Sequence, residues 1–226
     1  MVKVNNDKIQ EIENFITILE TKILMDNDIR QSFCMISKKI LIIKQILSVN
    51  NQRDFLDSMI YSLLMGIKIL ISDHFKQEQY DLYIRIFIEH GFKMLTDKDR
   101  NSRITVDQIR EEILKQYNSS NLKKEIKSKI DTLYNFYSDC SGSLHGGARK
   151  LDNVGLYFND LYIENKIEVT KLKKQVEQLK KILDNIIYFI ILLKPDMILE
   201  AFLNKMFELE YLLSEKQYKM IKSMIH

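Results

Sequence analysis

The chain has 226 residues, of which 46 % are hydrophobic and 29 % charged, a balance that excludes an intrinsically disordered chain. Its 34 basic and 31 acidic residues give a net charge of +3, which is too even for a dedicated nucleic-acid coat protein. Cys34 and Cys140 are too few for a disulfide framework and stand in no metal-ligand spacing. One proline and six glycines leave long stretches free to be helical.

The first residues carry acidic and polar side chains where a secretory signal would need an apolar core. The most apolar run, residues 186–193, is far shorter than the roughly 20 residues that cross a bilayer. We therefore expect a cytoplasmic protein with no membrane partner.

Apolar residues recur at three- and four-residue steps through the first part of the chain, which predicts three amphipathic helices. The three stripes are Ile9, Ile12, Ile16, Leu19 and Ile23; then Ile29, Phe33, Ile36, Ile40, Ile43 and Leu47; then Phe55, Met59, Ile60, Leu63, Ile67 and Leu70. The first two stripes predict an antiparallel hairpin. In the third helix, Gly66 would allow another helix to approach closely.

Three more helices are predicted before the first glycine pair. The first covers residues 77–95 and is followed by a polar loop. Thr105 offers an N-cap for the second, and Gln108 completes a possible capping box. The apolar period of the third continues to His145, before the glycines at 146–147 stop it.

The C-terminal part contains a long heptad seam. Its residues are Leu172, Val176, Leu179, Leu183, Ile186, Ile190 and Leu193. Such a seam packs inside a chain or forms a dimer. Before it, residues 148–165 have the aromatic content of a short hairpin or an ordered loop. After it, Pro195 suits the first turn of one further helix, and Ser214 with Gln217 predicts the cap of a last one.

The predicted fold class is therefore all-α. We expect an antiparallel helical bundle over residues 51–195, with an N-terminal hairpin at 1–50 packed on it and C-terminal helices at 196–226. The length suits one large helical domain, and nothing requires two cores.

Arg85, Glu89 and Lys93 follow one another at four-residue steps, so one stripe of the helix over residues 77–95 carries alternating charge among apolar neighbours. An internal ion pair that fixes helix register is one interpretation. The other is a functional row that acts together with a second helix.

The best candidate for that second helix carries Tyr137, Ser141 and His145, which share one face if the helix is continuous. Histidine can act as a general base or acid near neutral pH, Ser141 can hydrogen-bond its ring, and Arg85 could stabilise a developing phosphorane charge. These groups suit metal-independent RNA cleavage, in which the 2′-hydroxyl of RNA is the nucleophile. The alternative is that His145 only caps the last carbonyls of its helix.

Other polar groups give weaker signals. Residues 146–150 resemble an anion-binding loop without the glycine spacing of a nucleotide cradle. We assign Arg149 and Lys150, together with Lys93, to substrate binding. His90 is interpreted as a packing or surface histidine.

The helix containing Arg85 and Glu89 in RIFIE, followed by a later helix ending YSDCSGSLHGG, resembles the HEPN superfamily, particularly its abortive-infection and Apea-like branches. The resemblance covers about residues 55–195 at the level of helix order. It implies an antiparallel bundle with a polar pocket between two helices, and a homodimeric ribonuclease whose histidine, His145 here, lies at the pocket. The HEPN signature has an arginine shortly before that histidine. Residues 139–144 contain none, so Arg85 would substitute from the neighbouring helix, or the site is inactive.

The resulting hypothesis is a HEPN-like protein of bacterial antiviral defence or toxin-antitoxin growth control that cleaves RNA without a metal or cofactor. His145 would move protons, Ser141 and Tyr137 would position it or a phosphate, and Glu89 would orient Arg85. A homo-oligomer or a partner protein from the same locus is expected. Two alternatives stay open: a non-catalytic helical module that binds a partner protein or nucleotide, and a coiled-coil assembly factor that uses the heptad seam.

Overall fold

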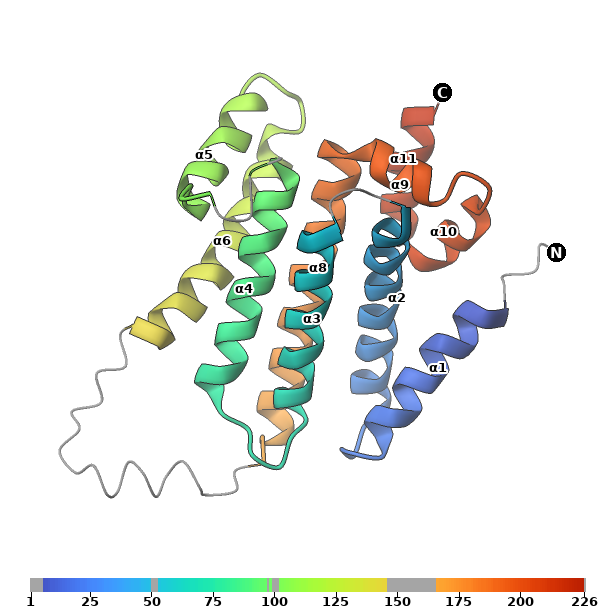
Figure 1. The fold of residues 1–226 in the computed structure, drawn as a ribbon, viewed down its shortest axis with the longest axis vertical. Coiled ribbons are helices and arrows are strands. Elements are labelled where there is room, and N and C mark those ends of the chain that lie inside the picture. Colours follow the sequence, from blue (N-terminus) through green and yellow to red (C-terminus); the bar gives the residue numbers. More distant parts are fainter. Residues whose placement is uncertain (1–5, 50–52, 97, 99–101, 146–165, 226) are drawn as a thin grey trace.

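The computed structural model describes residues 6–49, 53–96, 98, 102–145 and 166–225, and in these ranges the chain is helical with no strand. The helices are α1 (Asn6–Glu20), α2 (Asn27–Val49), α3 (Arg53–Leu70), α4 (Gln77–Leu95), α5 (Val106–Gln116), α6 (Lys123–His145), α8 (Val169–Leu193), α9 (Pro195–Ala201), α10 (Met206–Leu212) and α11 (Glu215–Ile225). Figure 1 shows α2, α3, α4 and α8 side by side, with α9, α10 and α11 gathered at one end. The predicted all-α class is confirmed.

The predicted apolar stripes face the interior of this bundle. In α1, Ile12 and Ile16 are buried, whereas Ile9 at the start of the helix is 37 % exposed. Helix α2 begins after Asp26, whose carboxylate accepts a hydrogen bond from the backbone N–H of Ile29 at 3.0 Å and so caps the helix. A single hydrophobic cluster contains residues from each of the helices that the structure describes.

Two glycines bring α4 close to its neighbours. A Cβ atom at Gly66 of α3 would lie 2.9 Å from Cδ1 of Ile84 in α4, so the close approach predicted for this glycine is present. A Cβ atom at Gly91 of α4 would lie 3.2 Å from Cδ1 of Ile186 in α8. Helix α4 is therefore held tightly between α3 and α8.

The heptad seam packs inside the chain. Its residues from Leu172 to Ile190 are buried, and α8 contacts α2, α4 and α6. Internal packing thus accounts for the seam without a second copy of the chain. In the part of the chain that the structure describes, no helix combines the length and apolarity needed to cross a membrane.

Helix-start signals in the sequence have the expected geometry. Thr105 and Gln108 form the capping box of α5. At α11, the Ser214 hydroxyl accepts a hydrogen bond from the Gln217 backbone N–H at 3.4 Å, and the Gln217 side chain accepts one from the Ser214 N–H at 3.3 Å. Pro195 lies in the first turn of α9.

The segment after Pro195 differs from the single helix that was predicted. It forms α9 and α10, separated by a turn in which the Lys205 N–H donates to the Phe202 carbonyl at 2.8 Å. Phe202 and Leu209 are both fully buried, and both helices contact α2. If residues 195–212 formed one straight helix, part of this apolar surface would point away from α2. Packing against α2 therefore favours two short helices over a single one. The hairpin or loop predicted at 148–165 lies outside the described residues.

A buried polar network fastens α11 to the bundle. Lys39 of α2 is only 3 % exposed, and its ammonium donates to Oε1 of Gln217 at 2.7 Å and pairs with Asp184 of α8 at 3.1 Å. Gln217 also donates to the backbone carbonyl of Asp184 at 3.1 Å. Because each polar group has a partner, this network fixes how α2, α8 and α11 sit against one another.

Replacing Gly66 by leucine should destabilise the protein by about 1–3 kcal/mol, because the added side chain has no room beside Ile84. The matched control is Gly142→Ala in α6, where a Cβ atom would meet nothing within 4 Å. This change should stabilise the helix by up to about 1 kcal/mol. Urea unfolding measures both, and a Gly66→Leu variant as stable as the parent would contradict the close packing of α3 on α4.

Candidate functional site

Polar and aromatic side chains meet where α4 packs against α6. The guanidinium carbon of Arg85 lies 5.5 Å from the centre of the Tyr137 ring. One turn earlier in α4, Oδ1 of Asp81 lies 3.8 Å from Sγ of Cys140, which is about one turn later in α6. These two contacts give the helices an antiparallel register, so the start of α4 faces the end of α6.

Among the predicted site residues of α4, Arg85 contacts α6, the helix that carries Tyr137, Ser141 and His145. Its side chain is partly exposed and lies over the face of Tyr137. A cation–π contact of this kind contributes about 0.5–1 kcal/mol at an exposed site.

Glu89 and Lys93 form an ion pair along α4, with 3.0 Å between the ammonium and the carboxylate. Lys93 is only 6 % exposed, whereas Glu89 is partly exposed. This arrangement corresponds to the internal ion pair considered from the sequence. It places Lys93 in the interior, away from the surface where a substrate would bind.

Helix α6 is unbroken to its end at His145, as the sequence predicts, so Tyr137, Ser141 and His145 occupy successive turns of one face. The Ser141 hydroxyl donates to the Tyr137 carbonyl at 2.8 Å and is thus engaged within its own helix. The side chain of His145 lies outside the described part of the chain, as do Arg149 and Lys150.

Helix geometry sets the spacing between Arg85 and the position of His145. Residue 145 follows Tyr137 by about two turns, roughly 12 Å along the axis of α6. Arg85 lies over Tyr137, so Arg85 and position 145 belong to neighbouring stretches of the α4–α6 contact. Any joint action on one substrate has to span that distance.

A cavity of about 280 Å³ lies beside this contact, between α4, α6 and α8. Its floor is made of the buried residues Tyr80, Asp81, Ile84, Cys140 and Ile182. Its rim is made of the partly exposed Gln77, Phe136, Gln175 and Gln178 and the exposed Asp139. Sequence patterns did not reveal this cavity, because its lining comes from three helices. The one available signal was a polar pair, Gln77 and Asp81, at i,i+4 spacing on the stripe that continues to Ile84 and Ile88.

The polar groups of the cavity form a chain of contacts. Gln77 donates to Oδ1 of Asp81 at 2.8 Å and accepts from the amide of Gln175 at 3.5 Å. Burial, reinforced by the nearby charge of Asp81, raises the pKa of Cys140 to about 12, while Arg85 acts in the opposite direction. The thiol is therefore protonated at neutral pH and donates to the carboxylate.

His90 and His74 are the other histidines that the structure describes. Nδ1 of His90 lies 2.8 Å from the Ser58 hydroxyl, at the interface of α3 and α4. His74 is exposed. Over the described residues, no group of three or more His, Cys, Asp and Glu side chains is arranged to hold a metal ion.

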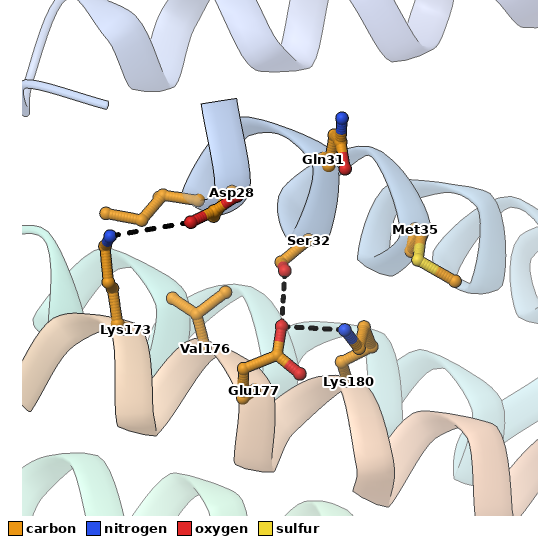
Figure 2. Close-up of a pocket in the computed structure, with 9 residues that line it drawn as sticks. Asp28, Gln31, Ser32, Met35, Lys173, Val176, Glu177 and Lys180 are labelled. Atoms are coloured by element: carbon orange, nitrogen blue, oxygen red, sulfur yellow. Dashed lines mark hydrogen bonds and ion pairs between the residues drawn. The ribbon is translucent and has the colours of Figure 1, made fainter. Parts of the chain in front are cut away.

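A second polar pocket, of about 370 Å³, lies between α2 and α8 (Figure 2). Glu177 pairs with Lys180 at 2.7 Å and accepts a hydrogen bond from Ser32 at 2.6 Å, and both contacts lower the pKa of its carboxyl. Lys173 lies 3.7 Å from Asp28 (Figure 2). Because both positive and negative charges of the pocket are already paired, it selects no ligand of one charge. The contacts of Ser32 with Glu177 and of Lys173 with Asp28 instead hold α2 on α8.

A larger groove, of about 620 Å³, runs between α1, α2 and α3. Its lining is mainly apolar, with Ile18 60 % exposed and Tyr61 61 % exposed. Exposed apolar surface of this kind suits a binding role. It offers little for proton transfer or phosphate binding, so the α4–α6 contact and its cavity are the better candidate for chemistry.

Comparison of the chain with protein-family models, with curated proteins and with solved structures found no match.

Cys140 should react with iodoacetamide at pH 8 far more slowly than an unperturbed cysteine, because a thiol with a pKa of about 12 is almost wholly protonated. Asp81→Asn removes a negative charge that raises this pKa, so it should speed the reaction several-fold. Both rates can be measured by mass spectrometry in a Cys34→Ser background. Alkylation of the parent Cys140 at the rate of a free thiol would contradict the buried contact with Asp81.

Proposed function

We propose that this chain is a HEPN-like endoribonuclease of bacterial antiviral defence or toxin-antitoxin growth control, which cleaves RNA without a metal ion. One observation supports this most: α6 is unbroken to His145, and Arg85 of α4 lies over Tyr137 of the same helix. The α4–α6 pair thus carries the position of His145, the hydroxyl groups of Tyr137 and Ser141, and the guanidinium of Arg85.

In this mechanism the 2′-hydroxyl of RNA attacks the adjacent phosphorus, and His145 accepts its proton. The O2′–P bond forms while the P–O5′ bond breaks, and the leaving O5′ takes a proton from solvent. The guanidinium of Arg85 offsets negative charge on the RNA backbone. Because position 145 is roughly 12 Å beyond Tyr137 along α6, Arg85 holds a phosphate farther along the strand than the reacting one.

The remaining predicted residues have supporting roles in this proposal. Glu89 follows Arg85 by one turn and orients it, while the buried Lys93 fixes the Glu89 carboxylate through their 3.0 Å ion pair. Lys93 therefore does not contact RNA directly. Arg149 and Lys150 follow the end of α6 in the sequence and supply positive charge for the RNA backbone.

A non-catalytic interaction module is the second candidate function. It is favoured by the internal engagement of the polar side chains: Ser141 donates within its own helix, and Glu89 pairs with Lys93. Arg85 also packs on Tyr137. Each of these contacts engages its side chains within the protein itself.

The two candidates differ in the effect of His145→Ala on RNA cleavage in the presence of EDTA. If His145 is the general base, this variant should lose about 10²–10⁴-fold in rate, because that is the usual contribution of a positioned proton acceptor. The matched control is His74→Ala, which removes an exposed histidine outside the α4–α6 contact and should leave the rate unchanged. If the parent and His145→Ala both cleave RNA only at the background rate, the ribonuclease proposal is wrong and the interaction module is favoured.

A further inference from the structure

We propose that the lysine-rich surface at the start of α6, together with the adjoining part of α11, binds the phosphate backbone of RNA. The surface lies at the opposite end of α6 from His145. The choice of RNA as the polyanion rests on the proposed ribonuclease, whereas the place of the surface rests on charge and packing alone.

Positive charge is concentrated in two short segments of the chain. Residues 115–130 contain five lysines and one glutamate, and α11 contains three lysines and one glutamate. Together the two segments carry a net charge of +6, whereas the whole chain carries only +3. The rest of the chain is therefore slightly acidic, so the field of the protein draws a polyanion to these segments.

An ion pair between α6 and α11 joins the two segments in space. The ammonium of Lys216 in α11 lies 2.6 Å from the carboxylate of Glu125 in α6. Glu125 is the one acidic residue among residues 115–130, so this contact engages the only negative charge of that segment. The other lysines of the segment thus have no carboxylate from their own part of the chain.

Three lysines in the first two turns of α6 have free ammonium groups. Lys123, Lys124 and Lys127 are all exposed. Among the residues that the structure describes, none of the three pairs with a carboxylate or lies over an aromatic ring. A phosphate can therefore approach them without displacing an existing partner.

The lysines of α8 differ in this respect. Lys180 lies 2.7 Å from the carboxylate of Glu177, and the ammonium of Lys171 lies 4.9 Å from the centre of the Phe75 ring. A phosphate would have to compete with these contacts. The start of α6 is therefore the better of the two lysine-rich stretches for binding a polyanion.

The turn before α6 places neutral hydrogen-bonding groups next to the free lysines. Asn118, Ser119 and Asn121 are exposed. The Ser120 hydroxyl accepts a hydrogen bond from the Leu122 backbone N–H at 3.1 Å, which holds the turn at the start of the helix. Asparagine, serine and lysine side chains all contact phosphate and sugar oxygens in complexes with nucleic acids. Their combination here fits a sugar–phosphate backbone.

The position of the surface sets a length requirement on the RNA. Lys127 precedes His145 by 18 residues, or about 27 Å along α6. Successive phosphates of a stacked strand are about 3.4 Å apart, so roughly eight nucleotides separate the two positions. A tetranucleotide can therefore reach only one of them.

Binding of a 20-nucleotide RNA that carries 2′-O-methyl groups tests the proposal, because the blocked 2′-hydroxyl prevents cleavage. Combined replacement of Lys123, Lys124 and Lys127 by glutamine should weaken binding by the full chain at least about tenfold at about 0.1 M salt. It should also lower the slope of log affinity against log salt by about 2, since each lost phosphate contact contributes about 0.7. Fluorescence anisotropy over a salt series measures both, and an unchanged affinity and slope would overturn the proposal.

The matched control replaces Lys171, Lys174 and Lys181, three exposed lysines of α8, by glutamine. It removes the same charge from another helix, and glutamine forms helix about as well as lysine does. Circular dichroism checks that both triple variants remain helical. RNA affinity should change little in the control. If both triple variants lose the same affinity, binding follows net charge alone and the proposal is wrong.

An anionic bilayer is the other polyanion that exposed lysines attract. Vesicles of phosphatidylserine and phosphatidylcholine are therefore tested by co-sedimentation with the same variants. Vesicle binding that depends on Lys123, Lys124 and Lys127, together with RNA binding that does not, would overturn the proposal.

The surface and the ribonuclease fail separately. Lysine-dependent binding of the modified RNA by a chain that cleaves no RNA would remove the enzyme and keep the surface. If the chain does cleave, the triple variant of α6 should slow cleavage of an unmodified 20-nucleotide RNA but not of a tetranucleotide. Equal slowing of both would show that the lysines do not act through a distant contact with the strand, and would overturn the proposal.

Discussion

The packing of α4 against α3, α6 and α8 is the constraint on which the rest of the structure depends. Gly66 lets α4 approach α3, and Gly91 lets it approach α8. With two faces of α4 committed in this way, its third face must meet α6, and that face carries Asp81 and Arg85. The tight apolar packing on two sides is what holds these polar groups in a defined register on the third.

That register has consequences for the proposed function. It brings Arg85 to Tyr137 and a buried carboxylate to the Cys140 thiol. It also places His145 about two turns beyond Tyr137. In the proposed ribonuclease, Arg85 and His145 would therefore act on different parts of one RNA strand.

Local signals in the sequence were sufficient for most of the fold. The capping boxes at Thr105 and Ser214 are formed by residues three positions apart, so they are visible without tertiary structure. The cavity was not predictable, because it depends on the register between α4, α6 and α8. The break between α9 and α10 was missed for the same reason: burial of Phe202 against other helices overrides the continuous apolar period.

The most direct test of the account is an NMR titration of the full chain with a short RNA. If the α4–α6 contact binds RNA, shift changes should concentrate at residues 77–89 of α4 and 137–145 of α6. Changes confined to the apolar groove between α1, α2 and α3 would contradict it, and so would an unchanged spectrum at millimolar RNA.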